Sequence, residues 1–145
     1  MTLRMITLVL AASCKVAVSP EPLGDYTSWK RVDVTGEAPG HGDTYRIIYA
    51  NDIAADPTAP LYVGYAEGSI IVKEIYANDA GEPGVLKSVV IMRRIGSVMT
   101  ALENQGGWLF SESQISHGAE TQSDTCWNRC HVASPYNGAW YDYRN

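Results

Sequence analysis

Short apolar runs rich in β-branched and aromatic residues alternate with turn-forming links along most of this chain. Such side chains fit a pleated, half-buried surface, so the runs predict strands. Four strands are expected, at residues 44–50 (TYRIIYA), 69–76 (SIIVKEIY), 86–95 (LKSVVIMRRI) and 108–112 (WLFSE). The link at residues 77–84 (ANDAGEPG) is rich in Asn, Asp, Gly and Pro, and it predicts an antiparallel hairpin between the second and third strands.

Helices are expected to be few and short. We place them at residues 23–32, within residues 53–65 and around the cysteines near the end of the chain. At 145 residues the chain has the length of one domain, and 46% hydrophobic with 19% charged residues is typical of a chain that can bury a core. The pattern therefore predicts an α+β fold, predominantly antiparallel β-sheet with a few short helices.

Charged residues lie among apolar ones in the strands predicted at residues 44–50 and 69–76. Alternation places Lys73 with Ile71 on one side of its strand and Glu74 with Val72 on the other. Because both sides are otherwise apolar, at least one of the two charges points toward packed surface, where a lysine tends to lose its proton and a glutamate needs a partner. Arg46 poses the same question: a buried arginine stays charged and faces a carboxylate or a polar cavity, and the alternative is a solvated strand face.

The first nineteen residues are typical of an export signal. Arg4 gives a short basic start, residues 5–12 form a nearly unbroken apolar run, and small residues surround Ser13. The run is too short to span a bilayer, which needs about 20 residues. Cys14 in LAASC resembles the cleavage box of a lipoprotein, in which the cysteine is lipidated, and both kinds of signal stay open.

Either signal leads to a mature protein outside the cytoplasm. We expect residues 1–19 to be the signal segment, residues 20–145 to be the folded domain, and the mature protein to be periplasmic or otherwise exported, with a lipid anchor if Cys14 is modified. Removing Arg4 and Lys15 leaves 9 basic against 16 acidic residues, a net charge of −7. This balance argues against nucleic acid and anionic membrane as partners and favours small molecules or a redox protein.

A cysteine pair followed at once by histidine lies at residues 126–131 (CWNRCH). In c-type haem proteins two cysteines hold the porphyrin through thioethers and the next histidine ligates the iron, with the usual spacing C-x-x-C-H. Here the spacing is C-x-x-x-C-H, and we expect the extra residue to form a small outward loop at Asn128, a residue type that tolerates left-handed backbone. A Cys126–Cys130 disulfide is the alternative interpretation; a zinc site would lack a fourth ligand unless Cys14 or another histidine joins.

The order of these motifs resembles the cytochrome P-460 and cytochrome c′-beta family. The matching pieces, spread over residues 29–143, are TYRIIYAND, GSIIVKEIY, VVIMRRI, GGWLFSES, the cysteine pair with its histidine, and WYDY. The resemblance implies a small periplasmic homodimer built on an antiparallel sheet. It also implies a single haem c, five-coordinate, with an open side for a small nitrogen ligand or substrate.

The resemblance also assigns roles by position. Cys126 and Cys130 would attach the haem, and His131 would ligate its iron. Lys73, in V-K-E, falls where P-460 members have a lysine that cross-links to the porphyrin, and Arg46 falls where they have an arginine on the open side. These two are the candidate catalytic residues.

The two branches of that family differ in activity. The P-460 branch oxidises hydroxylamine with the cross-linked lysine, whereas the c′-beta branch has no cross-link, caps its pocket with phenylalanines and binds nitric oxide. Phe110 is the one phenylalanine of this chain, which rules out a two-phenylalanine cap and favours a polar pocket containing Arg46. Whether the protein is a hydroxylamine-oxidising haem oxidoreductase or a gas-binding cytochrome stays open here.

The remaining histidines and the tryptophans are expected to have mainly structural roles. His41 and His117 both stand next to glycine in turn-rich stretches and are expected to be loop residues, although either could move protons near a haem pocket. The four tryptophans are expected to pack in the core or around the haem; they are Trp29, Trp108, Trp127 and Trp140.

Overall fold

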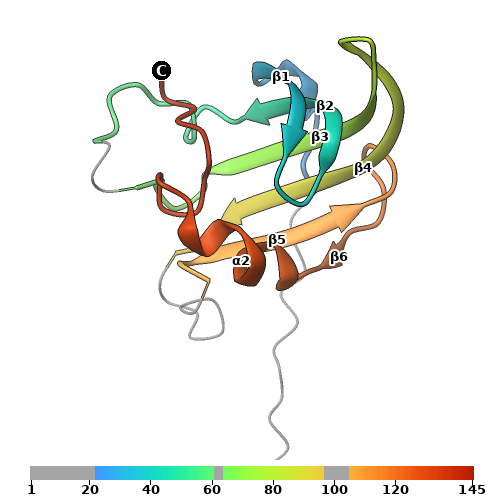
Figure 1. Cartoon of the computed structure of the whole chain (residues 1–145). Helices are drawn as coiled ribbons and strands as arrows, with labels where there is room; N and C mark the ends of the chain where they lie inside the picture. The colour runs from blue at the N-terminus through green and yellow to red at the C-terminus, as the bar shows by residue number, and fades with distance from the viewer. Residues whose placement is uncertain (1–21, 61–63, 97–104) are drawn as a thin grey trace, which may run out of the picture.

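The fold is one antiparallel sheet of six strands, each lying beside its neighbours in the sequence. The computed structural model describes residues 22–60, 64–96 and 105–145. Within them the strands follow the order β1-β2-β3-β4-β5-β6 across the sheet (Figure 1). Their bounds are β1 Lys30–Ala38, β2 Gly42–Ala50, β3 Ile70–Asp79, β4 Glu82–Arg94, β5 Trp108–Ser113 and β6 Thr121–Gln122. The expected class, mostly antiparallel sheet with few short helices, is confirmed.

The four predicted strands are all present, and the β3–β4 hairpin is tighter than its link suggests. Only Ala80 and Gly81 lie between the two strands, and both have positive φ, 53° and 96°. Two consecutive positive φ values are those of the type I′ turn, whose twist matches that of the flanking strands. Most of the predicted turn at residues 77–84 is therefore strand.

The helix predicted at residues 23–32 is wrong. This segment holds only the single-turn 3₁₀ helix η1 (Tyr26–Ser28), after which β1 begins at Lys30. Along β1 the exposed and half-buried residues alternate, and the strand pairs with β2 in register from Lys30↔Ala50 to Ala38↔Gly42. Exposure that alternates with a period of two residues is typical of a strand with one packed side. Here the pairing with β2 outweighs the local preference for helix.

The second predicted helix is also wrong over the residues that the structure describes, whereas the third is confirmed. Residues 53–60 and 64–65 form turns and bends. Asn51 starts this loop with its side-chain oxygen, which accepts hydrogen bonds from the backbone N–H groups of Ala54 and Ile70 at 3.0 Å each. Around the cysteines the chain does form a helix, α2 (Thr125–Arg129), followed by the 3₁₀ turn η3 (His131–Ala133).

Apolar side chains cover both faces of the sheet. On the face that we call the α2 face, Ile48, Ile71, Met92, Trp108 and Phe110 pack against Trp127 of α2 and Tyr143 near the C-terminus. On the opposite face, which we call the η1 face, Tyr45, Ile47, Tyr49, Val72 and Ile91 pack against Tyr26 of η1. The sheet is thus the middle layer of the molecule, with short helical segments on each side (Figure 1).

The charged pair of β3 is directed to both faces, as strand alternation predicts. Lys73 is on the α2 face, and Glu74, only 4% exposed, is on the η1 face. Tyrosine and serine hydroxyls supply the partners that a buried glutamate needs. Four hydroxyls donate to the Glu74 carboxylate: Tyr26 at 2.6 Å, Tyr76 at 2.8 Å, Ser116 at 2.9 Å and Tyr49 at 3.5 Å.

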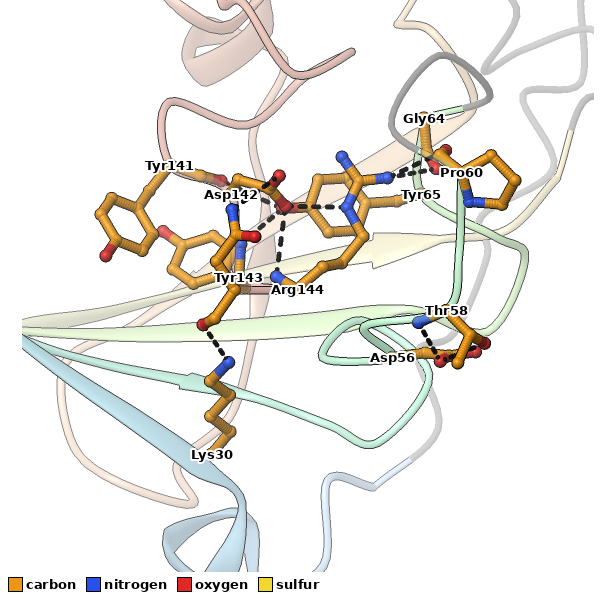
Figure 2. A network of polar contacts seen from close by, with 11 residues as sticks. Lys30, Asp56, Thr58, Pro60, Gly64, Tyr65, Tyr141, Asp142, Tyr143 and Arg144 are labelled. Atoms are coloured by element: carbon orange, nitrogen blue, oxygen red, sulfur yellow. Dashed lines mark hydrogen bonds and ion pairs between the residues drawn. The ribbon is translucent and has the colours of Figure 1, made fainter.

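A network of polar contacts fixes the C-terminal segment to the loop before β3 (Figure 2). Arg144 donates to Asp142 at 2.7 Å and to the Gly64 carbonyl at 3.1 Å, and its guanidinium lies 4.8 Å from the centre of the Tyr65 ring. The Tyr65 hydroxyl donates to the Tyr141 carbonyl and accepts from the Tyr143 N–H, each at 3.0 Å. These contacts hold residues 139–143 over the α2 face, where they form one wall of the cavity described next.

No helix in residues 22–60, 64–96 and 105–145 is long and apolar enough to cross a bilayer. The predicted signal segment at residues 1–19, with Cys14, lies outside the described residues.

Candidate functional site

A mostly apolar cavity of about 340 Å³ opens on the α2 face. Its floor is the sheet, one wall is the turn between β1 and β2, and the other is the C-terminal segment with the cysteine motif. Its volume lies within the range of about 300–1,000 Å³ that small-molecule and cofactor sites occupy. The polar residues that line it are Glu37, His41, Arg46, Lys73, Cys130 and His131.

His131 lines this cavity with a fixed ring orientation. It follows α2 directly, is 9% exposed, and bonds through Nδ1 to the Gly138 carbonyl at 2.6 Å. A carbonyl only accepts, so Nδ1 carries the proton and Nε2 keeps its lone pair. Burial, aided by the charge of Lys73, lowers the pKa of His131 despite the opposing hydrogen bond, so the imidazole is neutral at pH 7. A neutral imidazole oriented by its second nitrogen is the usual form of a histidine metal ligand.

The cysteine pair lies on one side of α2. Cys130 lines the cavity and Cys126 packs against the α2-face core, with both thiols free. The backbone N–H of Cys130 bonds to the Cys126 carbonyl at 3.3 Å, which is a helical (i, i+4) relation. The outward loop expected at Asn128 is wrong, because residues 125–129 are helical and Cys130 follows as the C-cap, which puts the two cysteines about one helical turn apart.

Neither rival interpretation of the cysteines gains support from the described residues. Cys126 and Cys130 are free, with no disulfide between them. Within the same part of the chain, no group of three or more His, Cys, Asp or Glu side chains is arranged to hold a metal ion. Cys14, the further cysteine that a zinc site would use, lies outside the described residues.

Lys73 extends from β3 into the cavity and meets a histidine there. Its Nζ lies 2.8 Å from Nε2 of His41. Burial is the main cause that lowers the pKa of Lys73 from 10.5 to about 8, and the charge of Arg46 adds to it. Burial and the neighbouring Lys73 charge lower the pKa of His41 to about 4. At neutral pH His41 is therefore uncharged and accepts a hydrogen bond from the Lys73 amine.

His41 is the site residue that sequence reasoning did not assign. We predicted a loop residue, and it does lie in the turn between β1 and β2, but this turn borders the cavity. The available signal was the alternation along residues 30–38, which identifies β1 and so makes residues 39–41 the tip of a hairpin beside Arg46. His117, the other predicted loop histidine, stacks on Tyr26 on the η1 face, with ring centroids 4.7 Å apart, away from the cavity.

Arg46 is buried beside Lys73 on the cavity floor. It is 6% exposed, and its Nη2 donates to the Gly36 carbonyl at 3.2 Å. Its Nε has no hydrogen-bond partner among the described residues. Burial lowers the pKa of Arg46, but a guanidinium stays protonated in proteins, so the cavity contains a fixed positive charge with unused donor capacity. Its interpretation as a solvated strand face is wrong.

The tryptophans pack in different places. Trp108 and Trp127 belong to the core of the α2 face, and Trp140 lines the cavity while remaining 52% exposed. Trp29 packs at the edge of the η1-face core. Trp140 is therefore the tryptophan that lines the candidate site, and Trp108 and Trp127 pack in the core of the same face.

An apolar cavity over an antiparallel sheet, with a buried neutral histidine directly after a cysteine pair, defines a small β-sheet haem protein. The residues present suit that cofactor: the imidazole Nε2 is left for iron, a thiol lies at the cavity wall, and the buried Arg46 has an unsatisfied donor for an anionic group. The chain belongs to the cytochrome P460 family, whose model, Cytochrome P460, matches residues 23–139. It is therefore a haem cytochrome by family. No curated protein matches the chain.

Proposed function

We propose that this protein is an exported mono-haem c-type cytochrome that binds or oxidises small nitrogen compounds, either hydroxylamine or nitric oxide. The observation that supports the proposal most strongly is the convergence of two groups of residues on one cavity. Cys130 and His131 come from the C-terminal motif, and Arg46, Lys73 and His41 come from the sheet and its first hairpin. A haem bound there supplies the iron at which such a compound binds or is oxidised.

Covalent attachment is the role proposed for the cysteines, and iron ligation the role proposed for His131. Cys126 lies in α2 and Cys130 caps its C-terminal end, and one backbone hydrogen bond joins them, so the two cysteines are about one helical turn apart. The histidine is held by Gly138 and faced by the Phe110 ring, with ring centroids 4.9 Å apart. Thioethers at Cys126 and Cys130 are therefore compatible with the native helix.

Arg46 and the Lys73–His41 pair supply the polar groups on the cavity floor. The Arg46 guanidinium can orient a small polar nitrogen compound through its free donor, in an apolar surrounding that strengthens the interaction. With a pKa of about 8, Lys73 is partly neutral near pH 7, and the neutral His41 lies at hydrogen-bond distance and accepts a hydrogen bond from the amine. A partly neutral amine is nucleophilic.

The position of the single phenylalanine favours the hydroxylamine-oxidising branch over the nitric oxide branch. Phe110 faces His131, so it lies on the histidine side of the cavity rather than opposite to it. The polar residues Arg46, Lys73 and His41 then remain for the ligand. Nitric oxide binding without turnover is the second candidate function, and it requires that Lys73 stays unmodified.

The test is an intact mass with an optical spectrum and a peptide map of protein matured with the cytochrome c assembly factors. We expect one covalently bound haem, a c-type pyridine haemochrome, loss of residues 1–19 or a lipid on Cys14, and a haem-modified peptide containing Lys73. Covalent haem with an unmodified Lys73 would support the nitric oxide branch. Absence of covalent haem would reject both and leave an exported module with a Cys126–Cys130 disulfide.

Matched variants assign each bond. Cys126→Ser and Cys130→Ser should each leave a single thioether, and His131→Gln should remove the axial ligand. Lys73→Met should abolish any cross-link, whereas Lys87→Met, at an exposed lysine of β4, should leave the mass and spectrum unchanged. The homodimer is proposed from the family resemblance and the redox partner from the acidic charge balance; sedimentation of the matured protein tests the dimer.

A further inference from the structure

The carbonyl that orients His131 belongs to a tight turn at residues 136–139. Tyr136 and Ala139 exchange backbone hydrogen bonds of 3.1 and 3.4 Å across it. The central residues Asn137 and Gly138 have φ values of 50° and 100°. Two consecutive positive φ values match a type I′ turn, for which Asn-Gly is a preferred pair. The direction of the Gly138 carbonyl is therefore set by the geometry of this turn.

Trp108 of β5 anchors the same turn from the sheet. Its indole Nε1–H donates to the Asn137 carbonyl at 2.7 Å, and its side chain is fully buried. Gly138 lies so close to the indole that an added Cβ would stand 2.2 Å from Nε1. Phe110, two residues further along β5, faces the imidazole of His131. Strand β5 therefore contacts His131 directly through Phe110 and indirectly through the turn that Trp108 holds.

We propose that Trp108 is a positioning residue that fixes the tautomer and ring direction of His131. The Asn137 and Gly138 carbonyls are consecutive, so anchoring the first restricts the second, which accepts from Nδ1 at 2.6 Å. The proton is then held on Nδ1 and the lone pair on Nε2 faces the cavity. A hydrogen bond at Nδ1 also makes the imidazole a stronger electron donor toward a bound iron. This last consequence rests on the proposed haem function, whereas the tautomer does not.

The first test uses the full chain produced without haem assembly factors and labelled with ¹⁵N-histidine. In the wild-type chain we expect the His131 ring to be protonated at Nδ1 alone, with a slowly exchanging proton. Trp108→Phe, which keeps a large ring but loses the donor, should populate both tautomers and speed the exchange of that proton severalfold. Trp29→Phe, a matched change on the η1 face, should behave as the wild type.

Two results would overturn the proposal. One is a wild-type His131 protonated at Nε2, which needs no variant and so does not depend on Trp108→Phe folding. The other is a folded Trp108→Phe chain that keeps a single Nδ1–H tautomer with the wild-type exchange rate.

The second test uses the haem-loaded protein. We expect Trp108→Phe to lower the iron–histidine stretching frequency in the reduced protein and to shift the reduction potential upward, since a weaker imidazole donor stabilises ferric iron less. If the iron–histidine stretching frequency and the reduction potential of Trp108→Phe equal those of the wild type, the claim that Trp108 makes His131 a stronger electron donor is overturned. If the chain takes up no haem at all, the proposed function fails while the tautomer measurement still decides the role of Trp108.

Discussion

Arg144 offers the sharpest test of how the cavity wall is held. The guanidinium is 3% exposed, pairs with the buried Asp142 at 2.7 Å, donates to the Gly64 and Pro60 carbonyls at 3.1 and 3.4 Å, and covers the Tyr65 ring. Arg144→Met removes every one of these contacts while keeping an unbranched apolar chain. It leaves the Asp142 carboxylate buried without its cation (Figure 2).

The expected loss in the free energy of unfolding is large, because a buried charge without its partner costs far more than an exposed ion pair contributes. Removing one partner of a buried ion pair typically costs about 3–5 kcal/mol. Asp142→Asn keeps an acceptor and leaves Arg144 its carbonyls, so we expect a smaller loss of about 1–3 kcal/mol. The double variant should lose less than the sum of the two, by about 1–3 kcal/mol of coupling.

The stability loss of Arg144→Met should also change with pH in a defined direction. Burial alone would raise the pKa of Asp142, but the hydrogen bonds and charge of Arg144 overcome it and hold the pKa below its usual range. A lowered carboxyl pKa stabilises the fold above the unfolded pKa, and that stabilisation is lost as the pH falls through the folded value. In Arg144→Met the cation is lost while burial and the hydrogen bonds from the backbone N–H of residue 144 and from Asn145 remain, so the pKa of Asp142 rises relative to the wild type. The variant's deficit should therefore shrink on acidification from about pH 7 to about pH 4.

Urea unfolding of the wild type and the three variants at both pH values measures these quantities. Arg31→Met is the matched control, because the Arg31–Asp33 pair has the same 2.7 Å contact but is 51% and 37% exposed. Its loss should stay within about 1 kcal/mol. An Arg144→Met deficit no larger than that of the control, or one that is the same at both pH values, would refute the reasoning.

Three further predictions concern single residues. The free energy of unfolding should rise with pH between about 8 and 10.5, where folded Lys73 has lost its proton and the unfolded chain has not, and urea series on Lys73→Met should lack this rise. Glu74→Gln turns one acceptor of the Tyr26 hydroxyl cluster into a donor and should cost about 1–3 kcal/mol in the same assay, so an unchanged stability would contradict the proposed hydroxyl network. Gly138→Ala should cost more than about 1 kcal/mol, because its Cβ would overlap Trp108 at a positive φ, and an unchanged melting temperature would exclude that clash.

Sequence reasoning predicted the sheet well where β-branched and aromatic residues were dense. The strands around residues 44–50 and 69–76 were found for this reason, as was the direction of Lys73 and Glu74 to opposite faces. It failed for β1, whose segment mixes charged residues with Val32 and Val34 and holds only half-buried apolar positions. There the strand depends on pairing with β2, which is a long-range property and not a local one.

Sequence reasoning predicted most residues of the candidate site, but it did not predict how the fold brings them together. Lys73, Arg46, Cys130 and His131 line one cavity, although the roles assigned to them remain to be tested. His41 was missed because its place beside Lys73 exists only once β1 and β2 form a hairpin. The spacing of the cysteines was misjudged for a related reason: whether three intervening residues form a loop or a helical turn depends on the packing of Trp127 in the core.

The four hydroxyls around Glu74 also affect the cavity on the opposite face of the sheet, because they favour one alignment of β3 against β2. Adjacent residues of a strand face opposite ways, so a one-residue slip of β3 against β2 would place the Glu74 carboxylate in the apolar cavity and the Lys73 amine among the tyrosines. Such a slipped strand would bury an anion beside the candidate metal ligand and a cation without a carboxylate partner. The hydroxyls around Glu74 therefore stabilise the β2–β3 register in which the Lys73 amine lies in the cavity.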